Sequence, residues 1–256
     1  MKIMKTGWLL LVAAAACTDS TGRVGFSLTT RSGAPAASVT AAISAALQAG
    51  PACSGLLVPA PAGTTDALCI TSAGLILREV ELKRVEVAAC DALPDNGDCA
   101  DFETGPAFLA LPLTSTQVSA DVSVKDAPPG MYDRLEFEVH KPDATEVVQG
   151  LPQGFPSGIS IEVQGTFNGT AFDYQTDLNA KQEVRFATPL DLAGGTTKNV
   201  TLSVDLSGWF KNSSGTALVD PASANKGQPN ESVVANNIQV SFKGFEDDNH
   251  DGISDH

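Results

Sequence analysis

The sequence predicts a mainly β protein, an antiparallel β-sandwich with a short C-terminal helix. Three observations favour this class. Seven to nine short segments of alternating apolar and polar residues recur between about residues 24 and 206. Gly, Pro, Asn and Asp residues, which are typical of tight turns, separate these segments. The chain has 256 residues and 43% hydrophobic residues, which is enough for one full core.

The charge balance excludes one large class of function. The chain carries 16 basic and 30 acidic side chains, a formal net charge of −14. Nucleic-acid binding requires a basic face, so we expect no nucleic-acid partner. The three histidines are His140, His250 and His256, which leaves little material for histidine-based catalysis.

The N-terminus has the pattern of a secretory signal peptide over residues 1–16. Lys2 and Lys5 precede a short apolar run, and four alanines precede Cys17. This arrangement resembles a bacterial lipobox, although Ala14 stands where leucine is usual. We therefore expect Cys17 to be the lipidated N-terminus of the mature chain. An ordinary signal peptide with a chance cysteine is the alternative.

Loss of the signal peptide changes the charge and sets the location. Residues 1–16 contain two basic and no acidic side chains, so the mature charge is 14 − 30 = −16. Residues 17–23 would form a tether that holds the protein to the bacterial cell envelope. Thr18, in place of Asp, is compatible with sorting to the outer membrane.

Four further cysteines predict disulfides in an oxidising compartment. Four cysteines allow three pairings, and we favour Cys53–Cys69 with Cys90–Cys99 because each closes a short loop rich in Gly, Pro or Asp. A zinc site is the rival interpretation, but the sequence has no C-x-x-C spacing and few histidines.

The first half of the sandwich has two strand signals around an insertion. Residues 24–30 alternate as a strand, and residues 32–65 form an Ala/Pro-rich insertion in which 37–48 could be a short helix or a mobile loop. The strongest strand signal covers residues 73–88. Its apolar face switches around Glu79, which predicts a β-bulge or two strand segments. A helix is the alternative for 73–88.

The later strands follow the same logic. In residues 132–140 the apolar side chains of Leu135, Phe137 and Val139 share one face, which predicts a half-buried strand. Asn168–Gly169 is a strong hairpin signal between two strands. The remaining strands are expected at 108–113, 118–124, 159–167, 171–176, 183–186 and 199–206.

The C-terminal part changes character. Asp220–Pro221 can start a helical turn. Asn230 can cap a helix over about 231–245, in which apolar side chains recur at helical spacing. The sandwich domain would then cover 24–245, followed by an acidic tail over 246–256.

These segments together resemble bacterial envelope lipoproteins that carry "domain of unknown function 4382". The resemblance rests on the lipobox, VGFSLTT, VELKRVEV, PPGMYDRLEFEV, NGTAFDY and TLSVDLSGWF, and covers residues 24–210. It implies an Ig-like or transthyretin-like β-sandwich, a fold compared with carbohydrate-binding modules. The chain departs from the family in its insertion, its four cysteines and its tail. The family offers no catalytic residues to carry over.

The tail contains the first nine places of an EF-hand-like loop, which suggests calcium as a ligand. Gly252 stands at the sixth place, where a sharp turn is needed. The acidic ligand of the twelfth place is missing. A solvated acidic tail is the alternative. The candidate calcium ligands are Asp247, Asn249, Asp251, the carbonyl of Ile253, and Asp255.

Catalysis and sugar binding have weaker signals. Two pairs of glutamates lie on one strand face each, as the two carboxylates of a glycosidase could: Glu79 with Glu81, and Glu136 with Glu138. The same spacing is expected for solvated glutamates on the exposed face of a half-buried strand. His140 is expected as a surface residue at the end of a strand. Exposed aromatic rings could stack on sugar, and the candidates are Trp209, Tyr174 and Tyr132; for Trp209 the alternative is an anchor at the edge of the core.

The sequence therefore predicts a non-catalytic envelope lipoprotein, a binding or structural module for glycan or an envelope protein. A calcium-responsive surface protein is the first alternative, and a glycan-acting hydrolase is the second.

Overall fold

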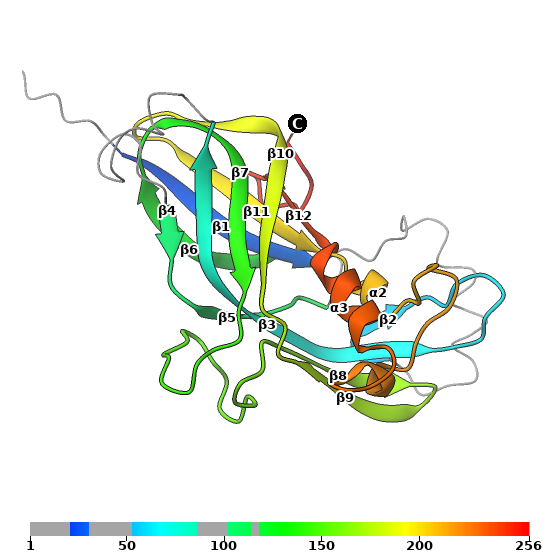
Figure 1. Ribbon diagram of the computed structural model, residues 1–256. Coiled ribbons are helices and arrows are strands. Elements are labelled where there is room, and N and C mark those ends of the chain that lie inside the picture. The colour runs from blue at the N-terminus through cyan, green and yellow to red at the C-terminus, as the bar shows by residue number, and fades with distance from the viewer. Residues whose placement is uncertain (1–20, 31–52, 86–101, 114–117, 256) are drawn as a thin grey trace, which may run out of the picture.

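The computed structural model describes residues 21–30, 53–85, 102–113 and 118–255, and it places them in two β-sheets packed as a sandwich (Figure 1). The mainly β fold predicted from sequence is confirmed. The described residues form a four-stranded sheet in the order β12-β11-β1-β6. Its strands are β1 (Gly22–Thr30), β6 (Val118–Ala127), β11 (Thr197–Val204) and β12 (Phe242–Glu246).

The second sheet has eight strands in the described part of the chain, with the path β10-β7-β3-β8-β9. Three short strands pair with β3 outside this path. The strands are β2 (Leu56–Val58), β3 (Leu68–Arg84), β4 (Phe102–Thr104), β5 (Ala107–Ala110), β7 (Gly130–Val139), β8 (Ile161–Phe167), β9 (Thr170–Thr176) and β10 (Ala180–Leu192).

One pairing departs from the expected antiparallel order. β1 and β11 run parallel, with Phe26 opposite Val200 and Leu28 opposite Leu202. Both strands are buried over most of their length, which is typical of a parallel pair covered on both faces. The other strand pairs of the described residues are antiparallel.

The core lies between the two sheets. Leu135, Phe137 and Val139 of β7 point into it, as the alternation predicted. Phe137 meets Phe242 of the other sheet with ring centroids 5.2 Å apart at an interplanar angle of 70°. Edge-to-face contact of this kind stabilises a core beyond the burial of the two rings.

β3 is the long strand that joins the two halves of the larger sheet. Its upper end pairs with β7, and its lower end pairs with β8 (Figure 1). The predicted irregularity at Glu79 is confirmed: its φ is 52°, and the register with β7 shifts between Arg78 and Glu81. The predicted hairpin is also confirmed, because Asn168 and Gly169 have φ of 51° and 80° between β8 and β9.

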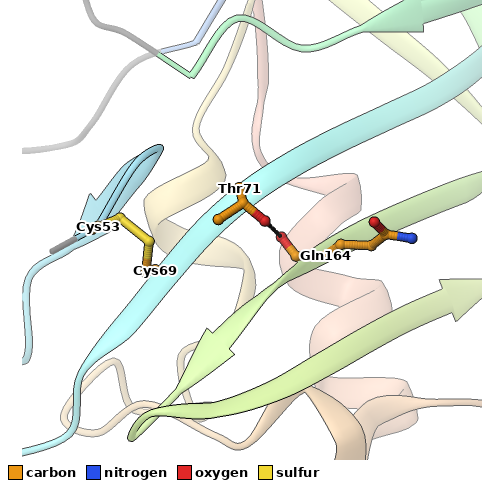
Figure 2. The surroundings of a disulfide bond; sticks show 4 residues. All are labelled: Cys53, Cys69, Thr71 and Gln164. Atoms are coloured by element: carbon orange, nitrogen blue, oxygen red, sulfur yellow. Dashed lines mark hydrogen bonds between the residues drawn. A yellow bond between two sulfur atoms is a disulfide. The ribbon is translucent and has the colours of Figure 1, made fainter. Parts of the chain in front are cut away.

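The disulfide Cys53–Cys69 is present, as predicted. It ties the chain just before β2 to β3, where Leu57 lies opposite Cys69 (Figure 2). On the other side of β3, the Thr71 hydroxyl donates to the carbonyl of Gln164 at 3.2 Å (Figure 2). Part of the expected 32–65 insertion is thus a strand of the sheet. Cys17, the signal peptide and the Cys90–Cys99 pairing lie outside the described residues.

Three short helical segments follow β11, namely α2 (Leu206–Trp209), the 3-10 helix η1 (Pro221–Ala224) and α3 (Glu231–Gln239). The predicted turn at Asp220–Pro221 is confirmed, with Asp220 as the N-cap of η1. Asn230 is the N-cap residue of α3, but its side chain makes no capping hydrogen bond.

The expected helix over 231–245 is too long. α3 ends at Gln239, and residues 242–246 form β12, which pairs with β11. Phe242 would face the core both in a helix that continues α3 and in a strand, so its spacing from Ile238 does not distinguish the two structures. A helix here would carry Gly244, which costs about 1 kcal/mol in a helix interior, and would leave the edge of β11 without hydrogen bonds.

In the part of the chain that the structure describes, no helix has the length and apolarity needed to cross a membrane.

Candidate functional site

The outer face of the larger sheet carries alternating charges on three neighbouring strands. On β3, Leu82 is buried toward the core, while Glu81 and Lys83 point to the opposite side. The same alternation continues on β7 and β10, so the outward positions of all three strands are charged. We call this surface the charged face; its residues are Arg78, Glu79, Glu81, Lys83, Arg134, Glu136, Glu138, Lys181, Glu183 and Arg185.

The strand register gathers like charges into rows. Glu136 of β7 lies opposite Glu81 of β3 on one side and opposite Glu183 of β10 on the other. These three glutamates form what we call the acidic row. Like charges directly opposite each other on neighbouring strands are destabilising, so the row has a cost in the isolated chain.

A row of the opposite charge lies two residues away on each strand, on the side of the acidic row toward the C-terminal end of β3. Arg134 lies opposite both Lys83 and Arg185, and these three form the basic row. On the other side of the acidic row, Glu138 lies between Arg78 and Lys181. The basic row therefore borders the acidic row on one side, and a mixed row with two cations borders it on the other.

Ion pairs along each strand connect the two rows. Lys83 contacts Glu81 at 2.5 Å, Arg134 contacts Glu136 at 3.4 Å, and Arg185 contacts Glu183 at 2.8 Å. Each strand thus contributes one acid and one base to the two rows. The face has nearly balanced charge, but the charge is arranged as parallel rows.

The surface is hollowed next to the acidic row. A pocket of about 230 Å³ lies between the bulge of β3 and the edge strand β10. Lys181 contacts Glu79 across it at 3.4 Å. The pocket is lined by Glu79, Glu81, Glu136, Phe137, Lys181, Gln182 and Glu183.

A buried ion pair anchors one side of the face. Glu138 is 4% exposed and accepts two hydrogen bonds from Arg78, at 2.6 Å from Nη2 and 3.1 Å from Nε. The hydrogen bond with Glu138 raises the pKa of Arg78, although burial opposes the shift. Glu138 therefore has a structural partner and does not sit free in the pocket.

His140 is buried, so the expectation that it is a surface residue is wrong. It is 4% exposed, and its Nε2 lies 2.6 Å from Oε2 of Glu146 in the following loop. Its Nδ1 is buried and has no hydrogen-bond partner among the described residues. The hydrogen bond with His140 lowers the pKa of Glu146 against the opposing effect of burial.

The aromatic residues expected to stack on sugar are core residues. Trp209 and Tyr132 are fully buried, and Tyr174 is 1% exposed. Trp209 Nε1 donates to Ser241 Oγ at 2.8 Å, and the Tyr132 hydroxyl donates to the carbonyl of Pro128 at 2.7 Å. Tyr174 packs edge-to-face on Phe210, and burial raises its pKa. Trp209 is therefore the core anchor that the sequence offered as the alternative, and none of the three rings forms an exposed platform.

The tail is folded onto the smaller sheet and is not a free acidic segment. Asp247 is fully buried. Its carboxylate accepts hydrogen bonds from the backbone N–H of Asp251 and Gly252, both at 3.0 Å, and from the Thr201 hydroxyl at 2.8 Å. The Asn199 side chain donates to the Asp247 carbonyl at 3.0 Å. Asp247 therefore fixes the start of the loop to β11.

The other candidate calcium ligands lie in the loop that Asp247 begins. The Asp251 carboxylate accepts from the Ile253 N–H at 2.8 Å, and Asn249 Oδ1 accepts from the Asp251 N–H at 2.9 Å. Asp255 closes the loop, because its Oδ2 accepts from the Asp248 N–H at 2.6 Å. Over the described residues, no three His, Cys, Asp or Glu side chains gather in a way that could hold a metal ion.

One lysine ties the tail to β11 by charge. Lys198 Nζ donates to Asp248 at 2.8 Å and also to Glu246. The hydrogen bonds with Asp248 and Glu246 raise the pKa of Lys198 despite its partial burial.

The rows of the charged face are the feature that sequence reasoning missed. The sequence shows charged residues alternating in three segments, but rows appear only when the register aligns them. The sequence pairs Glu79 with Glu81 and Glu136 with Glu138 within single strands, whereas the structure brings Glu79, Glu81 and Glu136 to one pocket.

Comparison with known proteins assigns no family. No family model matches the chain, and no curated protein matches it. Among solved structures, MbnP from Methylosinus trichosporium is similar with a TM-score of 0.34 and 14% identity, over 74% of this chain and 76% of MbnP. A likeness this distant carries no argument about function.

Proposed function

We propose that this chain is a non-catalytic lipoprotein of the bacterial cell envelope that binds an envelope protein through its charged face. The observation that carries the proposal is the pair of charged rows on β3, β7 and β10. Ordered charge of this kind gives specificity to protein recognition and sets the register of a partner.

The location rests on the sequence and on one covalent bond. Residues 1–16 have the signal-peptide pattern, and Cys17 follows them in a lipobox-like setting. The disulfide Cys53–Cys69 fits an oxidising compartment such as the periplasm or the cell surface. The sequence resemblance to envelope lipoproteins with domain of unknown function 4382 implies the same location, but no family model matches the chain.

A protein partner is favoured over a glycan. The aromatic side chains that a sugar-binding surface would use are in the core. Hydrolysis of a glycan is also disfavoured, because a glycosidase needs one carboxylic acid and one free carboxylate about the scissile bond. On the charged face, Glu81, Glu136 and Glu138 are each engaged by a basic side chain.

Lipidation is tested by the change Cys17→Ala in cells given labelled palmitate. We expect wild type to incorporate the label and to fractionate with the envelope membrane, and the variant to lose both. Thr18→Ser, next to the anchor, is the control that should retain both. Equal labelling of wild type and Cys17→Ala would contradict the anchor.

Binding through the charged face is tested by photo-crosslinking in intact cells. A photoreactive residue at Arg185, whose side chain is 62% exposed, should give a defined crosslinked product. The same residue at Lys243, an exposed position of β12 in the other sheet, is the matched control. Products of equal yield from both positions, or from neither, would contradict the proposal.

A second candidate function, calcium binding to the folded tail, rests on its EF-hand-like sequence and on the loop that begins at Asp247 and is closed by Asp255. The test is calorimetry with calcium, with magnesium as the control ion. Asp251→Asn keeps the shape and hydrogen-bonding oxygen of this exposed residue but removes its charge. We expect binding heat for wild type that the variant loses. Equal heats for wild type and variant would remove the tail from the candidate metal sites.

A further inference from the structure

We infer that the partner of the charged face is a second copy of this chain, bound face to face about a twofold axis. This inference rests on the proposed function, because it names the partner of the same face. It follows from the relation between the two rows: an acidic row and a basic row of three residues each lie side by side on the same three strands.

Such a surface is complementary to itself. A twofold axis that lies in the interface, parallel to the rows and midway between them, places the acidic row of each copy on the basic row of the other. The axis preserves the order of the strands. Glu136 then faces Arg134 of the second copy, Glu81 faces its Lys83, and Glu183 faces its Arg185.

Pairing of two copies offsets the repulsion between like charges that is present within each single chain. In one copy, Glu136 has a like charge on each neighbouring strand, and so does Arg134. In the pair, each of these rows is covered by three opposite charges. Networks of several charges stabilise more than isolated surface ion pairs, which contribute little. The ion pairs within each strand remain and become parts of four-charge clusters.

The residues at the β10 side of the rows are accessible to a second copy. The side chains of Arg185, Glu183 and Glu136 are 62%, 44% and 37% exposed. Those of Lys83, Glu81 and Arg134 are between 15% and 22% exposed, so they form the floor of the face. Contact would therefore begin along β10 and β7.

The association is expected to be weak and sensitive to salt. The charged face lacks the apolar centre of a permanent dimer interface, and exposed ion pairs are screened by salt. The mature chain also carries a net charge of 14 − 30 = −16, and the repulsion between two such chains opposes their association at long range. A lipid anchor would offset the weakness by confining the copies to one membrane surface.

The experiment is sedimentation equilibrium of the mature chain from residue 17 with Cys17→Ser, so that no lipid is attached. We expect a monomer–dimer equilibrium at about 20 mM salt that shifts to monomer at about 0.5 M salt. Monomer at every concentration and salt level would overturn the inference.

Two charge-reversed variants test the geometry. Lys83→Glu with Arg185→Glu reverses two charges of the basic row, and Glu81→Lys with Glu183→Lys reverses the two charges of the acidic row that face them in the pair. Each variant alone should associate at least about tenfold more weakly than wild type, a change of 1.4 kcal/mol. A one-to-one mixture should associate again, which also shows that both variants are folded. Lys243→Glu on the other sheet is the control and should associate as wild type.

The outcomes separate this inference from the proposed function. Wild-type association that neither variant weakens would place the interface elsewhere and overturn the inference. A monomeric protein that still gives a crosslink from residue 185 in cells would overturn the second copy as partner and leave the proposed function standing. A monomer without crosslinks would overturn both.

Discussion

Single residues decide how the tail is held. Asp247 is a buried carboxylate that satisfies two backbone N–H groups and the Thr201 hydroxyl. A buried charge is tolerated only with such partners, because its desolvation is expensive. The tail is therefore part of the sandwich, although its composition suggested a solvated segment.

The first prediction concerns Asp247. Asp247→Ala removes the acceptor of the buried Gly252 N–H and of the Thr201 hydroxyl, and one of the two acceptors of the Asp251 N–H, so we expect a loss of about 3 kcal/mol in the free energy of unfolding. Urea denaturation measures this. Asn249→Ala, at an exposed position of the same loop, should change stability by less than about 0.5 kcal/mol. Equal effects of the two changes would show that Asp247 is not the anchor.

The second prediction concerns pH. The pKa of Glu146 is lowered below its usual 4.5 by the hydrogen bond with His140. A lowered folded-state pKa means that this contribution to stability is present above pH 4.5 and is lost as the pH falls through the folded value. The stability difference between wild type and Glu146→Gln should therefore shrink as the pH falls below 4.5. A difference that grows on acidification would contradict the assignment.

At the scale of elements, the disulfide joins the chain before β2 to β3 across 16 positions. Closing a loop of about this length stabilises a protein by about 3 kcal/mol in the chain-entropy account. The third prediction is that Cys53→Ala with Cys69→Ala loses about this amount, measured by denaturation with urea. Reducing agent should then have a smaller effect on the variant than on wild type. An unchanged midpoint in the variant would contradict a stabilising role.

Local signals predicted most strands, because strand alternation and turn chemistry are short-range properties. The switch of face at Glu79 and the Asn168–Gly169 turn were both readable in this way. The parallel pairing of β1 with β11 joins residues far apart in sequence, and no local pattern carries it. The same reason hid the rows of the charged face, since they exist only in the register of three strands.

The end of α3 shows the limit of periodicity. Val234, Ile238 and Phe242 fit one helical face, yet Phe242 belongs to a strand. Spacing identifies an apolar face, but it does not show that the edge of β11 needs a hydrogen-bonding partner. Residues 242–246 supply that partner as β12, so the helix ends at Gln239. The sequence left Trp209 as either a sugar platform or a core anchor for a related reason: its burial depends on α2 packing against α3, which is a tertiary contact.

At the scale of the molecule, one sheet face differs from the rest. The chain is acidic overall, but the charged face places acids and bases in ordered rows on adjacent strands. Ordered charge on an envelope protein is suited to recognition of another protein. We therefore expect binding to depend most directly on the acidic row.

The most direct test of this claim is the crosslink from residue 185 in intact cells, compared between wild type and a chain with Glu136→Gln and Glu183→Gln. These changes remove the charge of two members of the acidic row and preserve their size. We expect the yield of crosslinked product to fall at least about tenfold, with the protein level unchanged. A crosslink of undiminished yield would contradict the claim that the charged rows bind the partner.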